Sequence, residues 1–147
     1  MSENEGSRLL GEDMQMRLVE GGPVDFVFQT DKPVEYVAVA NQGDGILGYL
    51  WACDADDAAG WEGRLAAGAI AMNGSRYWYG KLREAKARGL LPSQALAELS
   101  ADTEGGWSGQ VVSGSRAKAA SVVELRVKAR EGWEPPAQPE MPRGRGR

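Results

Sequence analysis

The chain has no histidine among its 147 residues, and this absence narrows its possible chemistry more than any other feature. Histidine is the commonest general base near neutral pH and the commonest metal ligand. Every catalytic pairing of serine or cysteine with histidine is therefore excluded. An enzyme built on this chain would depend on carboxylates, lysine or tyrosine, or on a reactive cofactor. We identify no catalytic residue and no cofactor, and favour a protein that is not an enzyme.

Cysteine is nearly absent as well, because Cys53 is the only one. No internal disulfide can form and no group of thiolates can hold a metal, so a reducing compartment is the simpler interpretation. The N-terminus is acidic and lacks the features of a secretion signal, and no apolar run approaches the ~20 residues that span a bilayer. We therefore expect a soluble, cytoplasmic protein that does not associate with a membrane.

Acidic residues at 54–57 resemble the start of a calcium-binding EF-hand loop. Counting from Asp54, the sixth and twelfth positions of that loop require glycine and glutamate. The chain has Ala59 and Leu65 there, so we expect no metal site.

Apolar residues make up 42% and charged residues 26% of the chain, a composition typical of a globular protein. Its length suits one domain. We expect a flexible leader over residues 1–13, a single globular domain over 14–132 and a disordered tail over 133–147. The tail is rich in proline and ends in Arg-Gly-Arg-Gly-Arg, and such a composition opposes a packed core.

Three strands are predicted in the first part of the domain. Apolar residues alternate with others over 24–29, and β-branched and aromatic residues follow over 34–40 and 46–51. The linking sequence Asn-Gln-Gly-Asp-Gly at 41–45 suits a hairpin loop, because these residues tolerate positive φ. Three sequential antiparallel strands are the economical interpretation.

Helices are predicted to follow. An apolar stripe favours one over 55–72, Ser75 and Gly89 are suited to begin and end a second, and Pro92 suits the start of a short third. Residues 117–120 favour a helical start, and the alternation over 121–130 then favours a strand, although helical signals compete there. The predicted fold is α+β: an N-terminal antiparallel sheet of three or four strands packed against two or three helices, with a possible C-terminal strand.

Gly43, Gly45 and Gly48 form the pattern G-x-G-x-x-G after a predicted strand. The pattern resembles a dinucleotide-binding fingerprint, in which glycines let a pyrophosphate approach the start of a helix. The stretch from Glu35 to Leu50 also resembles the central hairpin of GNAT acyltransferases, which implies acyl-CoA as a ligand. The alternative function is accordingly a nucleotide- or acyl-CoA-dependent enzyme that uses these three glycines.

The predicted helix that begins near Ser75 carries aromatic and basic residues, and we select five of them as candidate partner-binding residues: Tyr77, Tyr79, Lys81, Arg83 and Arg88. Such a combination can bind nucleic acid, but a pI near 5.0 disfavours that partner. The leading hypothesis is a non-catalytic protein-interaction module of regulatory or inhibitor type. The expected partner is another protein, and the sequence does not determine the oligomeric state.

Overall fold

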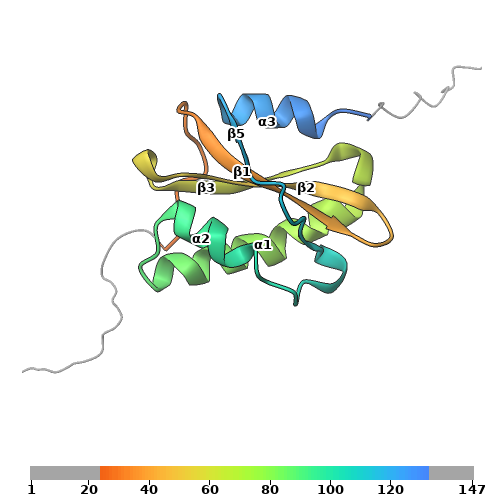
Figure 1. The fold of residues 1–147 in the computed structure, drawn as a ribbon, viewed down its shortest axis with the longest axis horizontal. Coiled ribbons are helices and arrows are strands. Elements are labelled where there is room, and N and C mark those ends of the chain that lie inside the picture. Colours follow the sequence, from red (N-terminus) through yellow and green to blue (C-terminus); the bar gives the residue numbers. More distant parts are fainter. Residues whose placement is uncertain (1–23, 133–147) are drawn as a thin grey trace, which may run out of the picture.

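The computed structural model describes residues 24–132, which form an antiparallel sheet with helices on both faces (Figure 1). The elements are β1 (Val34–Asn41), β2 (Gly45–Cys53), β3 (Ala58–Gly63), α1 (Ala69–Ala87), α2 (Pro92–Leu99), β4 (Gln110–Val111), β5 (Ala117–Ala119) and α3 (Val122–Ala129). Strand order is β3-β2-β1-β4, and β5 also pairs with β1. The predicted α+β fold with a C-terminal strand is confirmed. No helix in the described part is long and apolar enough to cross a membrane.

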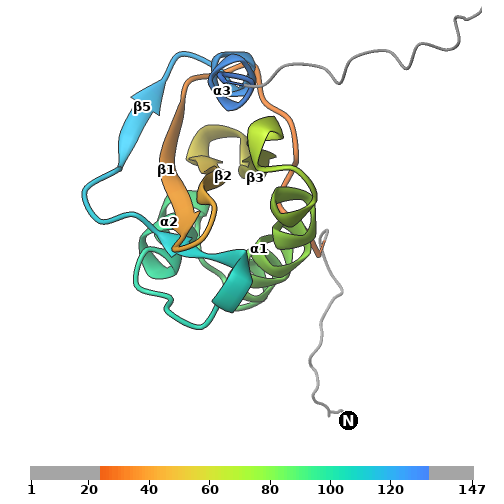
Figure 2. The same cartoon turned by 90° about the vertical axis from the view of Figure 1, so that its right-hand side faces the viewer.

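The sheet separates two cores. Helices α1 and α2 cover one face, where Trp78, Leu82 and Leu96 pack against the sheet, and α3 covers the other, where Leu125 packs near Trp51 (Figure 2). Side chains alternate between the faces of a strand, so Val37 and Val39 belong to the first core while Val34 and Ala38 belong to the second. This alternation explains why β1 is apolar on both faces. We call the two sides the α1 face and the α3 face.

The predicted hairpin is confirmed. Asn41 pairs with Gly45, and the register shifts between Val39 and Ala40, as a β-bulge requires. Gly45 has φ +72°, a conformation that other residues adopt at a cost, which explains the glycine at the end of the turn.

Two tryptophans lie directly on glycines of the neighbouring strand. A Cβ atom on Gly48 would lie 2.6 Å from Cζ2 of Trp61 and 2.6 Å from the carbonyl oxygen of Glu62. On the opposite face, a Cβ atom on Gly60 would lie 2.8 Å from Cζ2 of Trp51. Real Cβ atoms essentially never come so close, so each ring occupies the space that a side chain would take.

The predicted helix over 55–72 is wrong. Residues 58–63 form β3 instead, which pairs with β2 from Gly48↔Gly63 to Cys53↔Ala58. The glycines of this segment suit a strand because tryptophan rings lie on them. Asp54 precedes β3 and accepts hydrogen bonds from N and Oγ of Ser93, at 2.7 and 2.6 Å, in the first turn of α2.

The predicted strand over 24–29 is wrong as well. Within this segment only Val27 forms a bridge, to Ala58 of β3. Phe26 is buried, whereas Val24 and Phe28 are exposed, so the alternation does not reflect a buried strand face.

The helix predicted near Ser75 is confirmed but begins earlier, at Ala69, and Gly89 follows its end with φ +85°. The short helix that begins at Pro92 is also confirmed. At the C-terminal end the order is the reverse of the predicted one: residues 117–119 form a strand and residues 122–129 form α3. The prediction missed that Ser121 caps this helix by accepting a hydrogen bond from N of Glu124 at 3.1 Å.

We expect Gly48→Ala and Gly60→Ala each to lower the free energy of unfolding by about 1–3 kcal/mol, because the added methyl overpacks the sheet against an indole ring. Gly80→Ala is the matched control. It lies in α1 with nothing within 4 Å of its Cβ position, and should raise stability by up to about 1 kcal/mol. Urea unfolding measures all three. Sheet variants as stable as the control would contradict the proposed packing.

The contact between α3 and β3 includes a titratable ion pair. Glu62 has a side chain only 18% exposed and accepts a hydrogen bond from Nε of Arg126 at 3.3 Å. Burial raises the pKa of the Glu62 carboxyl, and the Arg126 guanidinium opposes this rise. A raised pKa in the folded state means that the stability contributed by Glu62 is present at low pH and is lost as the pH rises through that pKa.

We therefore expect the free energy of unfolding of Glu62→Gln, relative to that of the parent protein, to increase as the pH rises from 4 to 7.5. Arg126→Met should show the opposite dependence, because without Arg126 the buried carboxylate is less well compensated when it ionises. Urea unfolding at the two pH values measures both. A Glu62→Gln variant that loses more stability at pH 7.5 than at pH 4 would show that the ion pair outweighs burial.

Candidate functional site

Four of the five candidate residues lie in α1 and Arg88 directly follows it; together they lie on two flanks of the helix rather than on one surface. A residue every 100° places Tyr77, Lys81 and Arg88 along one flank and Tyr79 and Arg83 along the opposite one. Between the two flanks runs the buried stripe that faces the sheet.

The residues of the first flank form contacts with other residues of the chain. Tyr77 donates a hydrogen bond from its hydroxyl to Oδ2 of Asp102 at 2.5 Å. Desolvation and this bond raise the pKa of the Tyr77 hydroxyl. Nζ of Lys81 lies 5.5 Å from the centre of the Tyr77 ring. Arg88 forms a bidentate ion pair with Glu98 on α2.

The second flank closes an edge of the sheet. The hydroxyl of Tyr79 accepts a hydrogen bond from the main-chain N of Trp61 at 3.2 Å, and its ring meets Phe28 edge to face. Burial raises the pKa of the Tyr79 hydroxyl. Arg83 pairs with Asp25 at 2.8 Å. The structure therefore gives all five residues partners within the chain.

We expect Tyr79→Phe to lower the free energy of unfolding by about 1–3 kcal/mol, because it leaves the buried N–H of Trp61 without an acceptor. Tyr77→Phe should cost less, since water can reach the partly exposed Asp102 and replace the lost bond. Thermal or urea unfolding of both variants makes the comparison. A larger loss for Tyr77→Phe would reverse the assignment of Tyr79 as the structural tyrosine.

The three glycines of the G-x-G-x-x-G pattern lie in the hairpin. Gly43 is in the turn, while Gly45 and Gly48 belong to the antiparallel strand β2. A dinucleotide fingerprint needs a parallel strand that leads into a helix, whose N-terminus receives the phosphates. These glycines lead along β2 toward β3 and not into an α-helix, so the cofactor alternative lacks its structural setting. The requirement for glycine at position 48 is explained by the ring of Trp61, which leaves no space for a side chain.

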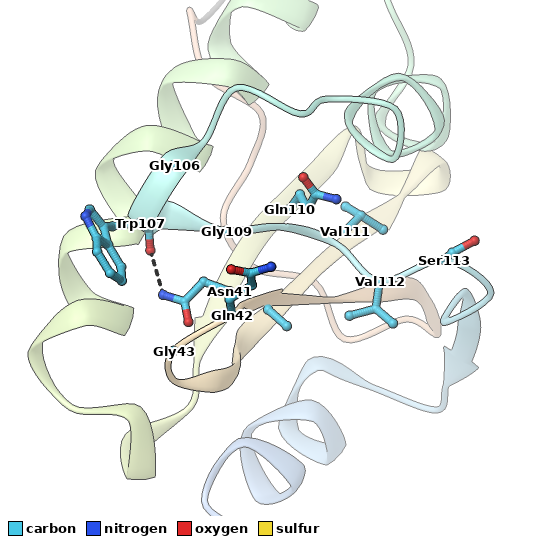
Figure 3. Close-up of a pocket in the computed structure, with 11 residues that line it drawn as sticks. Asn41, Gln42, Gly43, Gly106, Trp107, Gly109, Gln110, Val111, Val112 and Ser113 are labelled. Atoms are coloured by element: carbon cyan, nitrogen blue, oxygen red, sulfur yellow. Dashed lines mark hydrogen bonds between the residues drawn. The ribbon is translucent and has the colours of Figure 1, made fainter.

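An open groove of about 970 Å³ lies beside the tip of this hairpin (Figure 3). Its lining comes from two segments and contains no charged residue: residues 40–43 of the hairpin, and Gly106, Trp107 and residues 109–113 of the loop that includes β4. Trp107 is 72% exposed, and one edge of its ring lies beside Gly43. We call this feature the Trp107 groove.

The turn that carries Trp107 is held from two sides. Nδ2 of Asn41 donates a hydrogen bond to the carbonyl oxygen of Trp107 at 3.1 Å (Figure 3). From α1, the buried indole of Trp78 donates to the carbonyl oxygen of Ser108 at 2.8 Å. Gly109 has φ +87°, and a Cβ there would lie 2.7 Å from the carbonyl oxygen of Ala40, so this close approach requires glycine. The main chain is fixed while the indole projects outward.

The sequence analysis missed the groove because residues 101–116, which are rich in glycine and serine, gave no prediction of an element or a site. One signal was present. Trp107 stands in the sequence Gly-Gly-Trp-Ser-Gly, where a large aromatic residue has no apolar neighbours to pack with in a strand or helix. Such a residue either packs beneath its loop or faces solvent, and the sequence does not distinguish the two.

The acidic run near Asp54 provides no metal site. Within residues 24–132 no group of three or more acidic or cysteine side chains is placed to hold an ion. Asp56 pairs with Lys32, which lowers the pKa of its carboxyl, and Asp57 pairs with Lys86. These carboxylates are used in ion pairs and in capping α2.

No protein-family model, curated protein or solved structure matches this chain. The class of the molecule therefore follows from its own geometry. It is an α+β protein with an antiparallel sheet covered on both faces, and its open groove carries an exposed tryptophan.

Proposed function

We propose that this chain is a non-catalytic protein-binding module of regulatory or inhibitor type, which binds its partner at the Trp107 groove. The observation that carries the proposal is the contrast between the fixed main chain of Trp107 and its exposed indole. Tryptophan is enriched among the few residues that supply most of the energy of protein interfaces.

The rigidity of the turn supports this function. A binding group already held in its bound position loses little conformational entropy on association. Trp107 is held through Asn41 and Ser108, which tie its turn to the hairpin and to α1. The groove beside it offers the exposed amides of Gln42 and Gln110, which can form hydrogen bonds around a buried aromatic anchor.

The proposal moves the interaction surface away from α1. Lys81, Arg83 and Arg88 have acidic partners within the fold, and binding through them would first break those ion pairs. Exposed ion pairs of this kind contribute little stability, so α1 remains the second surface to test. A reducing, cytoplasmic setting belongs to the same proposal, since the one cysteine, Cys53, is a buried free thiol.

Affinity purification of the tagged full chain from its native cells tests the site. We expect a stoichiometric partner protein with the parent chain and a loss of at least about 30-fold with Trp107→Ala, as for an interface residue worth about 2 kcal/mol or more. Met72→Ala is the matched control, because Met72 is 74% exposed on α1 and lies outside the groove.

Two outcomes would overturn the proposal. One is a parent chain recovered as a monomer without a partner. The other is a partner retained by Trp107→Ala but lost with Arg83→Glu or Arg88→Glu, which would return the site to α1. Unfolding curves of each variant separate lost binding from lost folding.

A further inference from the structure

The Trp107 groove lies close to the point where the chain leaves the described fold. One row of paired residues crosses the sheet from Gly63 on β3 through Gly48 and Val39 to Val111 on β4, at the groove. Three strand spacings of about 4.8 Å make this row roughly 14 Å long. Distances across this end of the sheet are therefore short.

Helix α3 delivers the chain to the far end of that row. Gly132 lies beside Arg64, since a Cβ on Gly132 would be 3.2 Å from Nη2 of Arg64. Arg64 follows Gly63 and donates its main-chain N–H to Leu47 at 2.7 Å. In Figure 1 the C-terminal end of α3 and the tip of the hairpin lie at the same end of the sheet.

The exit point and part of the groove also share a face. Ala38 belongs to the core on the α3 face, and alternation along β1 places the side chain of Ala40 on that face too. A segment that leaves Gly132 can thus reach the Ala40 side of the groove across the ends of β2 and β1. The turn that carries Trp107 packs against α1 on the other face, so the segment passes the hairpin tip to reach the ring.

Residues 133–147 have the length for this path. A proline-rich segment in the polyproline II conformation advances about 3.1 Å per residue. The roughly 14 Å row corresponds to about five residues in this conformation. Fifteen residues follow Gly132, and the uncharged run Pro135-Pro136-Ala137-Gln138-Pro139 lies among the first seven of them.

The chemistry of this segment suits the groove. Proline-rich segments dock in aromatic-lined grooves, because their conformation is preformed and their carbonyl groups have no internal hydrogen bonds. Trp107 offers an exposed ring, while Gln42 and Gln110 offer amide donors. The groove is uncharged, as are residues 135–139, and exposed acids flank it: Asp44 in the hairpin turn and Glu104 before the Trp107 turn. Arginines at 143, 145 and 147 complement these acids and outnumber the two acids of the same segment, Glu134 and Glu140.

We propose that residues 135–142 of this chain dock in the Trp107 groove of the same molecule and compete there with the partner protein. The competition rests on the proposed function, whereas the docking itself does not. A short tether gives an effective concentration of about 1 mM, so a segment with a dissociation constant of that order as a free peptide occupies the groove about half of the time. Such a weak contact restrains binding without abolishing it.

Nuclear magnetic resonance of the full chain, labelled with ¹⁵N-tryptophan, tests the docking. The indole signal of Trp107 is assigned by its loss in Trp107→Phe. The test variant replaces the tail prolines at 135, 136, 139 and 142 by alanine within the full chain. We expect the Trp107 signal to move between parent and variant while the signal of buried Trp78 stays in place.

A synthetic peptide of residues 133–147 completes the test. Added to the alanine variant, it should return the Trp107 signal toward its parental position, and its apparent affinity for the parent should be about two-fold lower because the groove is already half occupied. The alanine variant should also recover about twice as much partner when partner is limiting.

Three results would overturn the docking. The Trp107 signals of parent and alanine variant could coincide; the peptide could bind both equally; or the parental signal could depend on protein concentration, which would show contact between two molecules. A partner that binds Trp107→Ala normally would instead overturn the proposed function and leave the docking intact. Unfolding curves confirm that the alanine variant retains the fold.

Discussion

The packing of Trp61 on Gly48 is the contact on which the rest of the sheet depends. Trp61 lies on the α1 face and covers the backbone of β2 so closely that no side chain fits at Gly48. On the α3 face, Trp51 covers Gly60 of β3 in the same way. Among the described residues, these two indoles hold the only buried side-chain polar atoms without a partner, so packing rather than hydrogen bonding explains their positions. Together they fix β3 against β2 from both sides.

The pairing of β3 with β2 determines which residues of α1 have a structural role. With β3 in place, its outer edge is closed by the main chain of Val27 and by the hydroxyl of Tyr79. Tyr79, which the sequence suggested as a partner-binding residue, therefore has a structural role. Its hydroxyl accepts a hydrogen bond from a main-chain N–H that would otherwise be buried without a partner. Arg83 and Arg88 pair with acidic residues of neighbouring segments. The open groove lies instead at the opposite edge of the sheet, beside β4.

Strand β4 is short, and the glycine-rich turn before it lets a large indole project from a fixed backbone. The close approach of Gly109 to β1 leaves no space for a side chain, while Asn41 and Trp78 anchor the turn. An uncharged groove with one exposed aromatic ring on a held backbone suits the proposed recognition of a partner protein. Its position near the end of α3 underlies the proposed docking of residues 135–142.

The sequence alone determined the elements whose signals are local. The β1–β2 hairpin follows from its turn residues, α1 and α2 follow from their periodicity and end signals, and the absence of histidine follows from composition. Only the tertiary structure decided that residues 58–63 form a strand, because the tryptophan rings that occupy the space beside their glycines belong partly to another strand. It also decided that α3 is a helix and that Trp107 faces solvent. Local sequence patterns indicate the secondary structure that a segment favours, but burial and exposure depend on residues that are distant in the sequence.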